Sequence, residues 1–137
     1  MKQLDVVKIK RVDNEIITCE LLTIEDKLEV FYKEIGCRCI DIVERRFGGR
    51  LFDVVCDDEA LLTEEPGLPT SLWFGRKEKG EREELLEGLF GTLLLCHNDG
   101  NGNLTNATPD DLLKIQQAYM EAGTTTGKTF YCLSHNL

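Results

Sequence analysis

Three arginines and one tryptophan are the residues whose types and spacing are best suited to ligand recognition. Arg45, Arg46 and Arg50 flank a pair of glycines in a chain with 25 acidic and 16 basic residues, a net charge of −9. The planar fork of an arginine side chain binds phosphate or carboxylate through two hydrogen bonds. Trp73 offers an aromatic face for stacking on a base or anchoring a partner. These four residues form the predicted site for a small anionic, nucleotide-like ligand.

Each of these residues also has a purely structural interpretation. The arginines equally suit a solvated hairpin tip whose charge Glu44 and Asp53 balance. Trp73 equally suits the closing of a hydrophobic core. The sequence leaves both interpretations open.

Two segments imitate well-known ligand loops. Residues 123–129 (GTTTGKT) resemble a phosphate loop, but three residues instead of four separate its glycines, and the segment follows a predicted helix instead of a strand. Residues 97–108 (HNDGNGNLTNAT) alternate oxygen donors as a calcium loop does. Its first position is His97 and its twelfth is Thr108, where glutamate is needed. We therefore expect a polar connection there, and neither a metal nor a cofactor.

The cysteines are expected to be reduced and mostly buried, because most lie in apolar runs and the chain opens without an export signal. They are Cys19, Cys37, Cys39, Cys56, Cys96 and Cys132. A strand over residues 37–43 would point Cys37 and Cys39 to one face, and their spacing is shorter than the spacing of ligands in zinc loops. A nucleophilic thiol would need a partner such as His97 or His135. We predict no catalytic residue and no enzyme.

Length and composition limit the remaining possibilities. The 137 residues, 42% of them hydrophobic, predict one domain over residues 1–137. The acidic balance disfavours direct binding of nucleic acid or anionic lipid. No signal peptide and no apolar stretch of membrane-spanning length is visible, so we expect a cytoplasmic protein without a membrane partner. The oligomeric state stays open, a homo-oligomer included.

Hydrophobic periodicity predicts an α+β fold, a small, mostly antiparallel sheet with two main helices. Helices are expected over 24–35, capped by Thr23 and ended by Gly36, and from Thr108-Pro109 to Gly123. Strands are expected at 4–9, 16–22, 37–43, 51–56 and 89–96, with an edge strand in 128–133 and a tight turn at the paired glycines 48–49. Residues 61–75 are expected to be irregular, and 77–87 a loop entering a short helix.

Several short patterns, in their order and spacing, resemble the domain-of-unknown-function family 3846 (DUF3846), small proteins of Firmicutes bacteria, their phages and their plasmids. They are residues 28–43 (LEVFYKEIGCRCIDIV), 55–61 (VCDDEAL), 67–69 (GLP), 71–75 (SLWFG), 90–95 (FGTLLL) and 104–115 (LTNATPDDLLKI). The resemblance covers roughly 27–117, without the first twenty residues or the tail after Gly123. It implies no assigned reaction.

Two functions follow as expectations. The first is a non-enzymatic binding protein of a mobile element that captures a small anionic ligand, such as a nucleotide signal of host defence. The alternative is an acidic interaction module that mimics DNA and occupies a host nucleic-acid-binding protein. Such mimicry would need one ridge of carboxylates from Glu81, Glu83, Glu84 and Glu87. An enzyme of unrecognised type is the third and least supported possibility.

Overall fold

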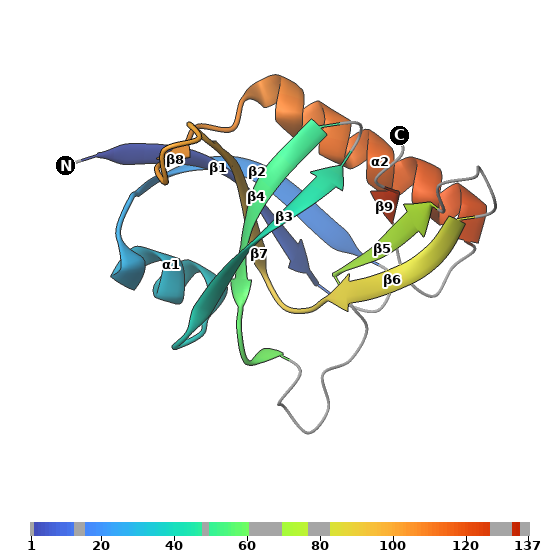
Figure 1. The fold of residues 1–137 in the computed structure, drawn as a ribbon, viewed down its shortest axis with the longest axis horizontal. Helices are drawn as coiled ribbons and strands as arrows, with labels where there is room; N and C mark the ends of the chain where they lie inside the picture. Colours follow the sequence, from blue (N-terminus) through green and yellow to red (C-terminus); the bar gives the residue numbers. More distant parts are fainter. Residues whose placement is uncertain are drawn as a thin grey trace.

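The computed structural model confirms an α+β fold and describes residues 2–12, 16–47, 50–60, 70–76, 83–126 and 133–134. Two sheets and two helices make up this part of the chain (Figure 1). In chain order the elements are β1 (Gln3–Arg11), β2 (Ile17–Glu25), α1 (Leu28–Ile35), β3 (Ile40–Phe47), β4 (Arg50–Asp57), β5 (Ser71–Arg76), β6 (Glu83–Leu89), β7 (Leu93–Asn98), β8 (Leu104–Thr105), α2 (Pro109–Thr126) and β9 (Leu133–Ser134).

The main sheet has the strand order β2-β1-β7-β4-β3, with every neighbouring pair antiparallel and β8 paired to β7. Successive side chains of a strand point to opposite faces. Val7 and Leu95 therefore join Ile115 of α2 in one core cluster, whereas Val6 and Leu94 join Phe31 of α1 in the other. Figure 1 shows α2 along the upper right of the sheet and α1 at the lower left. Each helix thus covers part of one face.

A second, three-stranded sheet has the order β6-β5-β9, with β5 antiparallel to β6 and parallel to β9. Buried Thr70 connects it to the rest of the molecule. Its carbonyl accepts a hydrogen bond from Tyr119 Oη at 2.9 Å, and its hydroxyl donates to the carbonyl of Gly91 at 2.6 Å. Within the described ranges, neither α1 nor α2 combines the length and apolarity of a membrane-spanning helix.

The predicted helix over 24–35 begins too early. β2 continues to Glu25, because Ile24 pairs with Leu4 and is only 8% exposed in the core on the α1 side. Thr23 donates its hydroxyl to Asp5 Oδ1 at 2.5 Å and caps no helix. The predicted end is confirmed, since Gly36 has the left-handed φ of 79° that closes α1.

The predictions for 61–75 and 77–87 are wrong where the chain forms β5 and β6. The acidic, leucine-rich segment of β6 has helical propensity, but its backbone pairs with β5 from Ser71↔Leu89 to Arg76↔Glu83. Pairing with a distant segment overrides such local preference. Residues 61–69 and 77–82 lie outside the described residues.

Other predicted boundaries of helices and strands differ from the structure by a few residues. β3 begins at Ile40, so Cys37 and Cys39 precede it and do not share a strand face as predicted. β7 begins at Leu93, and α2 passes Gly123 to end at Thr126. The hairpin of β3 and β4 is confirmed by the pair Phe47↔Arg50, although its two glycines lie outside the described residues.

Replacing Leu94 by alanine should lower the free energy of unfolding by about 2–5 kcal/mol, because its fully buried side chain would leave a cavity between α1 and the sheet. The matched control is Leu113→Ala in α2. That side chain is 58% exposed, and its loss should cost at most about 0.5 kcal/mol. Urea denaturation measures both values, and similar losses would contradict this assignment of the core.

Candidate functional site

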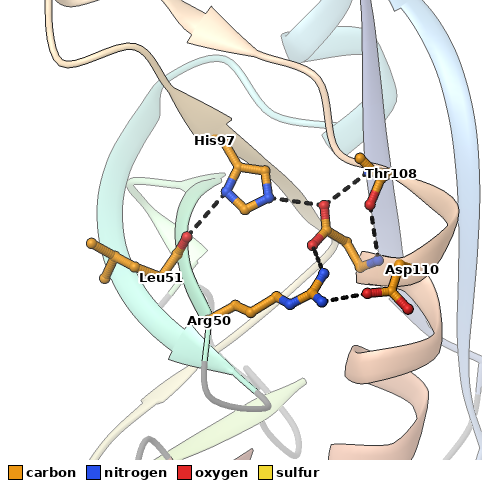
Figure 2. A network of polar contacts seen from close by, with 6 residues as sticks. Arg50, Leu51, His97, Thr108 and Asp110 are labelled. Carbon is orange, nitrogen blue, oxygen red and sulfur yellow. Dashed lines mark hydrogen bonds and ion pairs between the residues drawn. The ribbon is translucent and has the colours of Figure 1, made fainter.

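Arg50, the predicted ligand-binding arginine at the start of β4, binds two aspartates of its own chain. Its Nη1 donates to Asp111 Oδ1 at 2.7 Å, and its Nη2 donates to Asp110 Oδ2. Both aspartates belong to the first turn of α2, and Figure 2 shows the guanidinium beside Asp110. Arg50 therefore attaches the hairpin tip to the start of α2.

Asp111 is the centre of this network and is 1% exposed. Its Oδ2 accepts hydrogen bonds from His97 Nε2 and from the Thr108 N–H, each at 2.8 Å, while the Asp111 N–H donates to Thr108 Oγ1 at 3.2 Å. The last two bonds form a capping box that starts α2, with aspartate in the usual place of glutamate. Burial alone would raise the pKa of Asp111, but the hydrogen bonds from Arg50, His97 and Thr108 outweigh burial and hold that pKa below its usual range.

His97 is occupied at both ring nitrogens. Besides the bond to Asp111, its Nδ1 lies 3.1 Å from the carbonyl oxygen of Leu51, and its ring stacks on Phe52 with centroids 4.8 Å apart. A carbonyl and a carboxylate are both acceptors, so both contacts are hydrogen bonds when the imidazole carries a proton on each nitrogen. In this arrangement His97 connects β7, β4 and α2 (Figure 2), and neither nitrogen faces a thiol.

Arg45 lies in β3, the last strand of the main sheet. Its Nη1 donates to the backbone carbonyl of Glu44 at 2.7 Å, and in the same strand the N–H of Ile42 donates to Asp41 Oδ1 at 2.9 Å. Half of the backbone groups of an edge strand lack a strand partner. Two of those of β3 are therefore capped by side chains of β3 itself.

Arg45 also lines a pocket of about 230 Å³. Three carboxylates, those of Asp41, Asp57 and Asp58, line the same pocket, together with apolar side chains such as Val43. Partial burial lowers the pKa of the Arg45 guanidinium. The pocket thus combines one arginine with a surplus of acidic groups.

The other two predicted site residues are described by their backbones. Arg46 pairs with Leu51 in the main sheet, whereas Trp73 pairs with Glu87 and Leu133 in the small sheet. Their side chains lie outside the described residues. The four predicted site residues are therefore divided between two sheets.

Five of the cysteines are described, and all five are free thiols, as predicted; Cys132 lies outside the described residues. Burial raises the pKa of Cys19 and of Cys96 to about 12 and that of Cys56 to about 11. Such thiols are poor nucleophiles at neutral pH. Cys39 is exposed, contrary to the general expectation of burial. No cluster of three metal-binding side chains exists within the described part of the chain.

The calcium-like loop is closed by its own side chains. Asp99 Oδ1 accepts the N–H groups of Asn101 at 2.7 Å and Asn103 at 3.2 Å, and Asp99 Oδ2 accepts Asn103 Nδ2 at 3.0 Å. Gly100 and Gly102 supply the left-handed φ values of 80° and 91° that the bends require. The predicted polar connection is confirmed. Of the segment resembling a phosphate loop, residues 127–129 lie outside the described residues.

A second hollow, of about 480 Å³, lies between this loop and the hairpin of β3 and β4. Its lining consists of Ile42, Glu44, Asp53, Asn98, Gly100, Gly102 and Leu104. Glu44 and Asp53 entered the sequence-based prediction only as counter-charges for the arginines. The period-2 alternation of β3 and β4 was the signal that could have placed both on one face.

Replacing Asp111 by alanine should lower the free energy of unfolding by about 2–4 kcal/mol, because a buried carboxylate that accepts several charge-assisted hydrogen bonds is lost together with a helix cap. Asp110→Ala is the matched control. The Asp110 side chain is 59% exposed, so its loss should cost less than about 1 kcal/mol. Urea denaturation at neutral pH would contradict this role of Asp111 if the two variants lost equal stability.

Asp111 should also make the free energy of unfolding of the domain depend on pH in the acidic range. Its pKa is lower in the folded chain than the value of about 3.9 for an unfolded aspartate, so its contribution is complete well above pH 4 and is lost as pH falls through the folded pKa. The difference in unfolding free energy between wild type and Asp111→Asn should be largest near neutrality and shrink below about pH 4. Glu59 and Asp99, whose pKa values are also lowered, are present in both proteins and largely cancel. A difference independent of pH would rule this explanation out.

Comparison with known proteins gives a family without an assigned activity. A family model described as a domain of unknown function, DUF3846, matches residues 7–121. The match extends beyond the predicted 27–117 at both ends and takes in most of β1 and all of β2, which the resemblance had left out. No curated protein and no solved structure matches the chain significantly. Because the matched region is well over half of the chain, the protein belongs to the DUF3846 family.

Proposed function

We propose that this chain is a non-enzymatic binding protein whose acidic surface occupies the positively charged face of a nucleic-acid-binding protein in the cytoplasm. The observation that carries the proposal is that five cations of the described chain pair with carboxylates of the same chain, while other carboxylates face solvent. The ion pairs are Lys2–Asp26, Lys8–Glu34, Lys27–Glu25, Arg38–Glu59 and Arg50 with Asp110 and Asp111. The surplus behind the net charge of −9 is therefore a surplus of carboxylates.

Several of these carboxylates face solvent. They make no ion pair with any described residue and are the exposed side chains of Glu20, Glu29, Glu44 and Asp58. Fixed negative charge of this kind attracts cationic protein surfaces and speeds their association. A protein that binds nucleic acid presents such a surface. In a phage or plasmid setting, occupying that surface would antagonise the host protein.

Mimicry of DNA would need the predicted ridge of carboxylates, whereas the proposal made here requires only charge attraction. The backbones of Glu83, Glu84 and Glu87 form part of β6, while their side chains and all of Glu81 lie outside the described residues. The proposal therefore rests on the charge balance of the described side chains. The ridge stays a prediction.

Capture of a small anionic ligand is the second candidate, and the position of Arg45 at a pocket of about 230 Å³ favours it. The three aspartates in that pocket weigh against an anion, and Arg50 is engaged with α2. We therefore rank this function second. Arg45→Ala is the variant that tests it.

Immobilised protein should retain a nucleic-acid-binding protein from a nuclease-treated Firmicutes lysate, and short duplex DNA should release that protein. Replacing Glu20, Glu29 and Asp58 together by their amides should weaken retention by about tenfold or more, because long-range charge attraction is reduced. Mass spectrometry identifies the retained protein. If no retained protein is displaced by duplex DNA, the proposal fails. Heat on titration with nucleotides that Arg45→Ala abolishes would instead support the second candidate.

A further inference from the structure

The hollow beside the calcium-like loop contains two carboxylates on one face of the sheet. Glu44 and Asp53 are directly opposite each other in the β3–β4 register, so their Cβ atoms are about 5 Å apart. Asp53 is only 8% exposed, and its Oδ1 accepts a hydrogen bond from the neutral amide of Asn98 at 3.0 Å. Within the described ranges, neither carboxylate has a cationic partner. A cation entering the hollow would meet both.

Apolar side chains flank this acidic pair. Ile42 is 44% exposed and Leu51 is 46% exposed, and by alternation each shares the face of the carboxylate two positions along its own strand. Two positions of a strand span about 7 Å. α1 covers the adjoining part of this face, where Val55, the partner of Ile42 in the register, is buried in one cluster with Phe31. From Ile42 through the acidic pair to Leu51, this face thus runs apolar, acidic, apolar, and Arg46 is the partner of Leu51 in the register.

The loop that forms the opposite wall of the hollow is fixed by hydrogen bonds of its own side chains. Asp99 closes the loop through its hydrogen bonds to Asn101 and Asn103, and Asn98 Oδ1 accepts the N–H of Gly100 at 2.9 Å. Leu104 adds an apolar surface to this wall. A site whose polar groups already bond one another loses little conformational entropy on binding.

We infer that this hollow is the docking site for an extended basic segment of a partner protein, with a lysine or arginine between apolar residues two positions before and two after it. Side chains on one face of an extended segment repeat at the same spacing of about 7 Å as Ile42, the acidic pair and Leu51. The cation lies between Glu44 and Asp53, and its hydrocarbon stem packs against Leu104. The inference rests on the proposed function, and it specifies what the partner presents.

The test is a titration of the full ¹⁵N-labelled chain with the peptide acetyl-Val-Ser-Arg-Ser-Val-amide and with the same peptide carrying citrulline in place of arginine. Citrulline keeps the shape and removes the charge. The arginine peptide should cause saturable NMR shifts confined to β3, β4 and residues 98–104, and the citrulline peptide should bind at least about tenfold more weakly. Equal binding of both peptides, or shifts spread over the whole surface, would overturn the inference.

Glu44→Gln and Ile42→Lys should each weaken binding of the arginine peptide by about tenfold or more, because both change exposed side chains of the hollow. Glu20→Gln and Glu29→Gln remove the same charge from exposed positions outside the hollow and should change binding by less than about twofold. If these controls weaken binding as much as Glu44→Gln, the attraction is diffuse and the inference fails. It also fails if spermidine or Mg²⁺ reproduces the shifts and displaces the peptide, because the hollow would then be a small-cation site.

Failure of this inference and failure of the proposed function are distinguishable. If the captured protein of the lysate experiment binds Glu44→Gln and Ile42→Lys as well as wild type, the docking site is wrong and the proposed function stands. If the peptide binds as described but duplex DNA displaces no captured protein, the docking site stands and the proposed function fails.

Discussion

The Asp111 carboxylate connects three parts of the chain that the sequence keeps far apart. It caps the first turn of α2, and it accepts hydrogen bonds from the guanidinium of Arg50 at the hairpin tip and from the imidazole of His97 at the end of β7. At 1% exposure, its charge is tolerable only because these donors surround it. The orientation of α2 over the sheet and the position of the β3–β4 hairpin therefore depend on one another through this group.

This arrangement also decides which charges are available to a partner. Arg50 forms ion pairs with both Asp110 and Asp111, so the arginine that seemed suited to an anion is committed to the fold. Glu44 and Asp53, on the α1 side of the same hairpin, have no such cation among the described residues. A chain with an acidic surplus thus keeps its unpaired carboxylates where a cationic side chain can approach them.

The sequence predicted those features that depend on neighbouring residues. Gly36 ends α1 and Thr108-Pro109 starts α2, because caps are determined within one turn of the helix. The predictions failed where distant segments meet. Ile24 belongs to β2 because it pairs with Leu4, and β6 is a strand because β5 lies beside it. Arg50 and Asp111 are 61 residues apart, and no spacing rule relates them.

The capped edge of β3 bears on how an extended partner can bind. An unpaired edge strand can accept a further strand through its backbone groups. In β3 the N–H of Ile42 is bonded to Asp41 and the carbonyl of Glu44 to Arg45, so two of the groups that strand addition needs are already occupied. Such protection is typical of edges that resist aggregation. A segment recognised by Glu44 and Asp53 would therefore lie across the face of the hairpin, held by its side chains, and would not extend the sheet.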